Sequence, residues 1–399
     1  MRVAIAAAVI ALAACRDRGK REHADPPPSP PSTDMRDAQA ADASTWPQLA
    51  DYPHAEPARV IAIPTRTDVP RFDVGGPVIV GDLAIISSSQ FGFAAVDYRR
   101  GTIAWSKPAG LHVAPPLLAH GQGDSSSIVL VGECLSPPAI ADTDALLGCL
   151  RVVTPTGADQ AYIAIRGKPR EVEPFLAAVG LQSLWSAGDH AVRWRRGEAA
   201  VTIDLMTGIA RPASIEPPPI VVEYRDRRWE IRQVDGRIVA SGKPAWRTEH
   251  PYTAVLGPVW LPEQSPALRV VHLGAFSGTP EVRLLDMDAT GSLRAAIARP
   301  TPGISLLGWG IAPAGDAAIA VRMDRSIQRD FVVGYAANAM LMWVYALPEV
   351  PRADPVGVAV APDAVVVFHD GDTLTILPEL LAPPTSPGAG RGSSQNPTP

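Results

Sequence analysis

Thiols are among the most reactive side chains, and the 399 residues of this chain include three cysteines. Cys15 ends an apolar run that begins at Val3 and precedes a charged stretch. Cys134 and Cys149 share a stretch that is typical of a long loop between two strands. Two thiols this close in sequence could pair in an oxidising compartment, and two buried free thiols are the alternative. No cysteine or histidine spacing predicts a zinc site.

The first 15 residues have the layout of an export signal. Arg2 supplies a positive charge, and the apolar run after it is too short for a membrane-spanning helix, which needs about 20 apolar residues. The run ends in Leu12-Ala13-Ala14-Cys15, which resembles the lipobox of bacterial lipoproteins. This resemblance implies that residues 1–14 are a signal peptide and that Cys15 carries acyl chains such as palmitate, which anchor the protein in a membrane. An ordinary cleaved signal with a chance cysteine is the alternative.

Low-complexity segments flank the predicted folded domain, which spans residues 46–381. Residues 15–45 include a proline-rich run from Asp25 to Ser32 and predict a semi-extended, disordered tether. Residues 382–399 consist mainly of Pro, Gly, Ser and Thr, and they predict a disordered tail.

Short strands are predicted almost throughout the domain between these segments. The 42 prolines and 33 glycines of the chain favour many turns over long helices. β-Branched runs such as Leu83–Ile86, Ser127–Val131 and Ala364–Phe368 are typical of strands. One helix-like segment, residues 171–181, is interpreted as a loop insertion. The net charge of −5, without a basic stripe, argues against nucleic acid as a partner.

A strand–turn–strand repeat recurs along the domain. Its clearest copy has Asp97 and Gly101 in the turn and Trp105 at the end of the following strand, and a second copy has Asp204 and Gly208 without the tryptophan. The aspartate can accept hydrogen bonds from turn amides, the glycine allows positive φ, and the tryptophan can fill the space between sheets. The copies are residues 93–105 and 201–210, with looser ones at 282–293 and 332–343.

The clearest copy resembles the repeat of quinoprotein-type, or pyrroloquinoline-quinone-like, β-propellers, in which Ala-Leu-Asp-x-x-x-Gly precedes a strand ending in Trp. The resemblance implies an all-β fold, a β-propeller of about six to eight four-stranded blades. A pair of sheets in a β-sandwich is the structural alternative. The enzymes of this family also have adjacent cysteines and a calcium site of Glu, Asn and Asp. Neither pattern can be matched here, so the resemblance does not carry the activity.

Several other polar motifs are interpreted as structural. Asp286 begins a stretch similar to the start of a calcium loop, but it lies at a repeat turn and lacks the acidic twelfth residue. Asp370 begins a predicted hairpin turn, and His272 is interpreted as a strand residue. The serine runs that begin at Ser87 and Ser125 show no neighbouring base and are interpreted as turn or edge residues.

We therefore expect a non-catalytic envelope lipoprotein whose propeller binds other proteins, with no catalytic, cofactor or metal residues and no nucleic-acid partner. Its protein partners are not identified by the sequence. Arg16 stands where an aspartate would signal inner-membrane retention in some bacteria, so the outer membrane is favoured. The alternative is an enzyme or small-ligand binder on a propeller, similar to a quinoprotein dehydrogenase or a carbohydrate-active protein.

Overall fold

The structure is a computed structural model that describes the chain between residues 53 and 380. Residues 1–52 and 381–399 lie outside the described residues, and with them Cys15, the predicted signal and tether, and the tail. Short gaps remain at residues 70–73, 121–125, 189, 218, 225–226, 235–236, 244–245, 252, 261–265, 277–278, 289–291, 296–300, 303–304, 313–314, 323–329, 339 and 349–355.

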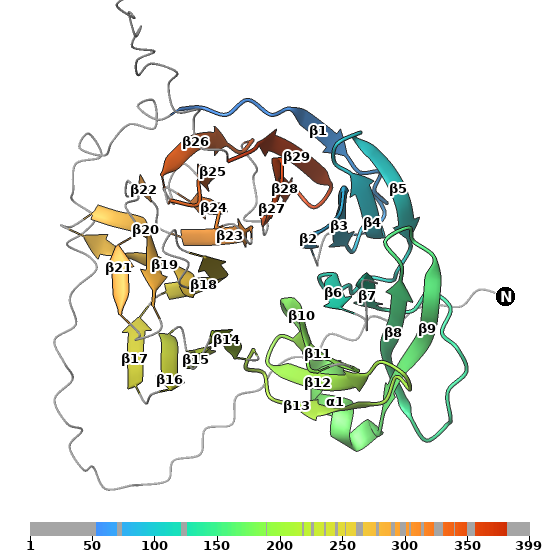
Figure 1. Ribbon diagram of the computed structural model, residues 1–399. Helices are drawn as coiled ribbons and strands as arrows, with labels where there is room; N and C mark the ends of the chain where they lie inside the picture. Colours follow the sequence, from blue (N-terminus) through green and yellow to red (C-terminus); the bar gives the residue numbers. More distant parts are fainter. Residues whose placement is uncertain are drawn as a thin grey trace, which may run out of the picture. The chain divides into compact units, whose positions relative to one another are not determined.

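Antiparallel sheets make up nearly all of the described chain, which confirms the all-β prediction (Figure 1). Seven sheets are described, six of four strands and one of five. Most sheets are built from strands that follow one another in sequence. Seven separate sheets do not fit the two-sheet β-sandwich alternative.

The first three sheets consist of β2 (Val74–Val80), β3 (Leu83–Ser88), β4 (Gly92–Asp97) and β5 (Thr102–Lys107); β6 (Leu117–His120), β7 (Ser126–Gly132), β8 (Ala145–Val153) and β9 (Asp159–Gly167); and β10 (Gln182–Ser186), β11 (Ala191–Arg196), β12 (Ala199–Asp204) and β13 (Ala210–Ala213). The next two consist of β14 (Ile220–Tyr224), β15 (Arg227–Val234), β16 (Arg237–Lys243) and β17 (Trp246–Pro251); and β18 (Thr253–Trp260), β19 (Pro266–Phe276), β20 (Thr279–Met287), β21 (Leu293–Ala295) and β22 (Thr301–Pro302). The last two consist of β23 (Ser305–Ile311), β24 (Ala317–Arg322), β25 (Asp330–Tyr335) and β26 (Leu341–Ala346); and β27 (Gly357–Ala361), β28 (Ala364–His369), β29 (Thr373–Pro378) and β1 (Arg59–Ala62).

The sheet of β27, β28, β29 and β1 joins the two ends of the described chain. β1 pairs antiparallel with β29, with Arg59 opposite Ile376 and Ala62 opposite Thr373. Just before β1, the amide of Ala55 donates to the carbonyl of Val344 on β26 at 2.9 Å. The segment that leads into β1 is therefore hydrogen-bonded to the neighbouring sheet as well.

The second strand of a sheet, such as β28, is apolar and buried because neighbouring sheets pack on both of its faces. Every residue of β28 is buried. Val366 and Phe368 pack in one core cluster with residues of the β2–β5 sheet. Val365 and Val367 pack in another with residues of the β23–β26 sheet. A continuous apolar run is therefore the pattern expected of such a strand, as in other sheets covered on both faces.

The first strands of neighbouring sheets approach one another closely, as contacts of β2 with β27 and of β23 with β27 show. A Cβ added to Gly357 on β27 would lie 1.7 Å from the carbonyl oxygen of Gly76 on β2. A Cβ added to Gly308 on β23 would lie 2.0 Å from the carbonyl oxygen of Val356. Glycine is required at these two positions because a backbone strand occupies the space of the side chain.

The repeat copies lie at the connections between the third and fourth strands of their sheets. Asp97 Oδ1 accepts a hydrogen bond from the amide of Arg100 at 2.8 Å. Asp204 Oδ1 accepts from the amides of Met206 at 3.0 Å and Thr207 at 2.8 Å. The glycines that follow, Gly101 and Gly208, have φ of 75° and 70°. The hydrogen bonds of Thr207 hold the pKa of Asp204 below its usual value.

Trp105 on β5 reaches the neighbouring sheet. Its indole Nε1 donates to the carbonyl of Pro155 at 2.9 Å, in the turn between β8 and β9. A Cβ on Gly157 would meet the indole ring at 2.5 Å. The tryptophan of the clearest repeat copy thus fills the space between two sheets, as the sequence predicts.

The helix α1 (Pro169–Ala177) joins β9 to β10. It begins two residues before the predicted segment, with a proline in the first turn, and ends earlier, before Gly180 adopts φ of 130°. Val172 and Phe175 are buried. The Phe175 ring meets that of Trp194 edge-on, with centroids 4.7 Å apart. The helix is therefore packed onto the β10–β13 sheet.

The interpretation of the first serine run as turn or edge residues was wrong for Ser87 and Ser88, which end the second strand β3, whereas Ser89 lies in the turn that follows. All three serines are buried. The Ser87 hydroxyl donates to the carbonyl of Gly75 at 3.4 Å, and Ser88 Oγ accepts from the amide of Gln90 at 3.3 Å. Local hydrogen bonds to backbone make these hydroxyls compatible with burial. Ser125 lies outside the described residues.

Candidate functional site

A cavity of about 270 Å³ lies where the β2–β5 sheet meets the β6–β9 sheet. Its walls include four buried side chains: Phe93 on β4, Ala109 after β5, Leu130 on β7 and Cys149 on β8. The remaining lining residues are Gly132 on β7, Arg151 on β8 and Tyr162 on β9, together with Pro108, Glu133, Leu135 and Ser136 in connections.

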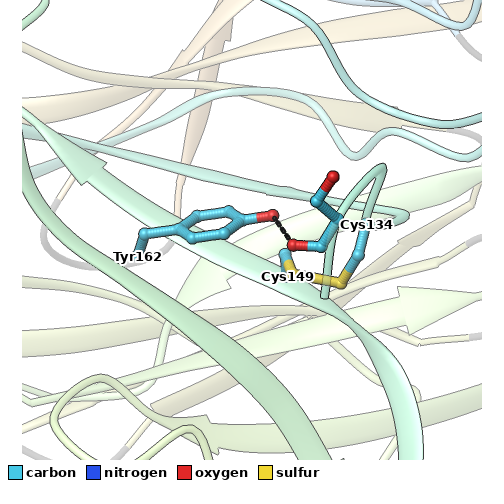
Figure 2. Close-up of a disulfide and its surroundings, with 4 residues drawn as sticks. Cys134, Cys149 and Tyr162 are labelled. Atoms are coloured by element: carbon cyan, nitrogen blue, oxygen red, sulfur yellow. Dashed lines mark hydrogen bonds between the residues drawn. A yellow bond between two sulfur atoms is a disulfide. The ribbon is translucent and has the colours of Figure 1, made fainter. Parts of the chain in front are cut away.

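Figure 2 shows the disulfide that links the β7–β8 loop to β8. Cys149 and the loop residues Leu135 and Ser136 line the cavity. Cys134 and Cys149 have their sulfur atoms 2.15 Å apart and their Cα atoms 5.1 Å apart. Beside them, the hydroxyl of Tyr162 donates to the carbonyl of Ser136 at 3.2 Å (Figure 2). Both bonds tie the start of the β7–β8 loop to the β6–β9 sheet.

Loss of the disulfide should loosen this loop. We expect the Cys134→Ser, Cys149→Ser double variant to lose about 3 kcal/mol of unfolding free energy, because the bond closes a loop of about 15 residues. Urea unfolding of the variant and of the oxidised protein measures the difference. Alkylation of both thiols in unfolded, non-reduced protein would show instead that the bond does not form.

A second loop, between β5 and β6, is hydrogen-bonded to the first. The amide of Gly110 donates to the carbonyl of Glu133 at 3.0 Å, and the amide of Glu133 donates to the carbonyl of His112 at 2.7 Å. The Glu133 carboxylate accepts from the amide of Leu111 at 2.7 Å. Three hydrogen bonds between the loops hold the mouth of the cavity in one arrangement.

Charged groups are distributed unevenly around the mouth. The Arg151 guanidinium lies over the Tyr162 ring, 4.8 Å from its centroid. Arg151 Nε is 3.7 Å from Asp159, whereas Lys107 Nζ is 3.2 Å from the same carboxylate. Two cations therefore share one acidic partner on this side, and the shorter contact belongs to the lysine.

Five large apolar side chains are exposed on connections beside the cavity. We call them the apolar loop face. Leu111 and Leu135 belong to the two loops at the mouth, and the others lie at or just after the end of α1. Their exposed fractions are 40% for Leu111, 54% for Leu135, 41% for Leu176, 79% for Val179 and 74% for Leu181.

Hydrogen bonds link these connections into one surface. His112, next to Leu111, has its Nε2 2.9 Å from an Arg196 nitrogen in the β10–β13 sheet. The amide of Gly197 donates to the carbonyl of Leu181 at 3.1 Å. Glu133, two residues before Leu135, bonds through its backbone to Gly110 and His112, on either side of Leu111. The connections that carry Leu111, Leu135 and Leu181 are thus held together by hydrogen bonds.

Sequence reasoning missed one set of groups that resembles catalytic machinery. His369 has Nδ1 2.8 Å from Asp370 and Nε2 2.8 Å from the Thr375 hydroxyl. Carboxylate, imidazole and hydroxyl stand here in the order of orienting acid, base and nucleophile. Thr375 and His369 are buried, however, and their hydrogen bonds connect β28 to β29 across the hairpin turn. We interpret the set as a brace of the hairpin.

Asp286 also has a structural role, because the Arg269 guanidinium donates hydrogen bonds to both of its carboxylate oxygens, at 3.0 and 3.2 Å. Within the described part of the chain, no three His, Cys, Asp or Glu residues are arranged to hold a metal ion. Among the same residues, no helix is long and apolar enough to cross a membrane.

No family model matches the chain, and no curated protein matches it. Solved structures do show similarity. A chain of a mitotic checkpoint complex is 12% identical with a TM-score of 0.42, covering 91% of this chain and 98% of that one. The β-propeller domain of Cps50 (Swd1) from Myceliophteria thermophila is 9% identical, with a TM-score of 0.45 and coverage of 81% and 99%. BamB from Moraxella catarrhalis is 9% identical, with a TM-score of 0.38 and coverage of 81% and 99%. These similarities concern the fold alone.

Proposed function

We propose that this protein is a lipid-anchored, seven-bladed β-propeller that binds other proteins and does no chemistry of its own. Seven described sheets support the blade number, and the pairing of β1 with β29 supports closure of the last blade by the N-terminal strand. The observation that carries the binding role is the apolar loop face beside the disulfide-closed loop.

The exposure of this face has a free-energy cost that a partner would remove. Val179 and Leu181 are more than two-thirds exposed, although each would contribute about 1.5–3 kcal/mol if fully buried. Several large apolar side chains exposed on linked connections are typical of protein–protein interfaces. The disulfide and the hydrogen bonds between loops hold the connections of Leu111 and Leu135 in place, so little conformational entropy of these loops would be lost on binding.

The proposed lipid anchor is inferred from the sequence Leu12-Ala13-Ala14-Cys15. Several acyl chains on one cysteine give stable membrane attachment. The tether that follows, residues 15–45, could extend to about 100 Å at the polyproline rise of about 3.1 Å per residue. A propeller on such a tether could reach partners within the envelope at some distance from the membrane, and Arg16 favours the outer membrane.

Replacement of the lipidated cysteine tests the anchor. Cys15→Ala should move the protein from the membrane fraction to the soluble fraction or leave it unprocessed, because the thiol that carries the lipid is gone. Fractionation and mass spectrometry of the mature N-terminus measure both outcomes. The Cys134→Ser, Cys149→Ser double variant is the matched control and should stay with the membrane. A wild-type mature chain that begins at another residue, or at an unmodified Cys15, would contradict the anchor.

Crosslinking in intact cells tests the binding role. A photoreactive amino acid at Val179 or Leu181 should give discrete crosslinked protein bands. The same amino acid at Met206 is the control, because Met206 is apolar and 75% exposed but lies in the β12–β13 turn. Equal bands from Met206, or none from the apolar loop face, would contradict the proposed function.

A further inference from the structure

We propose that the cavity beside the Cys134–Cys149 disulfide receives one apolar side chain of the protein partner, and that Arg151 selects a partner carboxylate next to that side chain. The proposal rests on the proposed function, since it names the point on the surface where a partner docks. It also states the chemistry of the partner segment: a leucine, methionine or aromatic residue followed or preceded by an acidic one.

The size and lining of the cavity favour a single side chain. Its volume of about 270 Å³ lies below the range of about 300–1,000 Å³ for sites that enclose a drug-sized molecule. Phe93, Ala109 and Leu130 form apolar walls, and the half-exposed Leu135 stands at the mouth. A polar group buried against these walls would lose its water without gaining a hydrogen bond. An apolar side chain has no such cost.

The surroundings of the cavity have the form of an interface anchor point. Binding energy in interfaces concentrates where a large side chain fills a desolvated pocket within a ring of contacts that exclude water. Here Leu135, Pro108 and Tyr162 surround the opening, and the rest of the apolar loop face continues from Leu111. An inserted side chain would therefore be covered by contacts that the partner makes around it.

Charge at the mouth favours an acidic neighbour. Arg151 Nε, at 3.7 Å from Asp159, is too far for a good hydrogen bond, and Lys107 holds that carboxylate more closely. Asp159 is the one described carboxylate within ion-pair distance of Arg151. A partner carboxylate could form the charge-assisted hydrogen bonds that Arg151 lacks. Glu133, held by the amide of Leu111, would repel an acid on its side and so orients the partner segment.

A random peptide library displayed on phage is the probe for this site. We expect peptides selected on the full oxidised chain to share an apolar residue adjacent to Asp or Glu. Leu135→Asp should weaken their binding at least tenfold, since it places a charge at the apolar mouth. Arg151→Gln should weaken acidic peptides about tenfold and leave the same peptides with Asn or Gln unchanged. Met206→Asp is the matched control and should stay within twofold.

Each result bears on the proposal. Leu135 is half-exposed, so Leu135→Asp should keep the circular dichroism spectrum and melting midpoint of the parent, and these are measured first. Selected peptides that bind Leu135→Asp as well as the parent would overturn the cavity as docking point. If Val179 still crosslinks, the scaffold role survives that result. No enriched peptide, or enriched basic peptides, would also overturn the cavity proposal. If the crosslinks from Val179 and Leu181 in intact cells are absent as well, the proposed function itself is overturned.

Discussion

Replacing Arg269 with methionine is expected to lower the free energy of unfolding by about 3–5 kcal/mol, because it leaves a buried carboxylate without its partner. Arg269 is 1% exposed on β19 and pairs with Asp286 on β20 through two contacts. It also donates to the carbonyls of Gly315 and Ala337, which belong to turns of the β23–β26 sheet. One side chain thus joins two sheets through a charge pair and two backbone acceptors.

Urea unfolding at constant m-value measures this loss, and two variants calibrate it. Arg322→Met removes a similar pair with Asp330, at 2.8 Å, but one with more access to water, so its cost should be clearly smaller. The double variant Arg269→Met, Asp286→Leu should recover much of the stability, because neither charge is then left unpaired. A cost below about 1 kcal/mol for Arg269→Met would show that water reaches the pair.

The same variant should respond to pH in a definite direction. Burial raises the pKa of Asp316, and the charge of Arg269 opposes that rise. Without Arg269, the pKa of Asp316 in the folded protein should rise further above its unfolded value. A carboxyl with a raised folded pKa loses stability as pH increases through that pKa. The stability deficit of Arg269→Met should therefore grow as the pH rises from the ordinary carboxyl pKa through the raised pKa of Asp316.

Adding a methyl group at Gly357 is expected to destabilise the protein by about 3 kcal/mol, and a valine by more. The added Cβ would lie 1.7 Å from the carbonyl oxygen of Gly76, and backbone cannot move aside as a flexible side chain can. β27 and β2 come from opposite ends of the described chain, so the strain falls on the contact between the first and last sheets.

Thermal and urea unfolding of Gly357→Ala give the measurement. Gly81→Asn is the matched control, since nothing lies within 4 Å of a Cβ at Gly81 and asparagine tolerates its φ of 58°. The control should stay within about 0.5 kcal/mol of the parent. An unchanged midpoint for Gly357→Ala would mean that β2 and β27 do not approach as closely as the structure has them.

The sequence by itself was sufficient for features that depend on neighbours along the chain. The apolar runs from Leu83 and from Ala364 predicted strands, and the Asp–Gly spacing predicted turns at Asp97 and Asp204. These predictions rest on backbone preferences and on side chains that bond within a few residues. The resemblance at residues 93–105 implied an all-β fold of four-stranded sheets. The repeat copies lie between the third and fourth strands of four of the described sheets.

Only the tertiary structure decided which residues are buried together. Arg269 stands inside an apolar strand pattern, and nothing local distinguishes its buried pair with Asp286 from a solvated charge. Ser87 and Ser88 are polar by type but lie on a strand that two sheets cover, and Ser89 in the following turn is buried as well. The cavity likewise brings together side chains of separate strands and loops, among them Phe93 and Tyr162. Val179 is exposed because no other segment of the described chain covers it. Burial arises from contacts between segments far apart in sequence, and periodicity along one segment does not record those contacts.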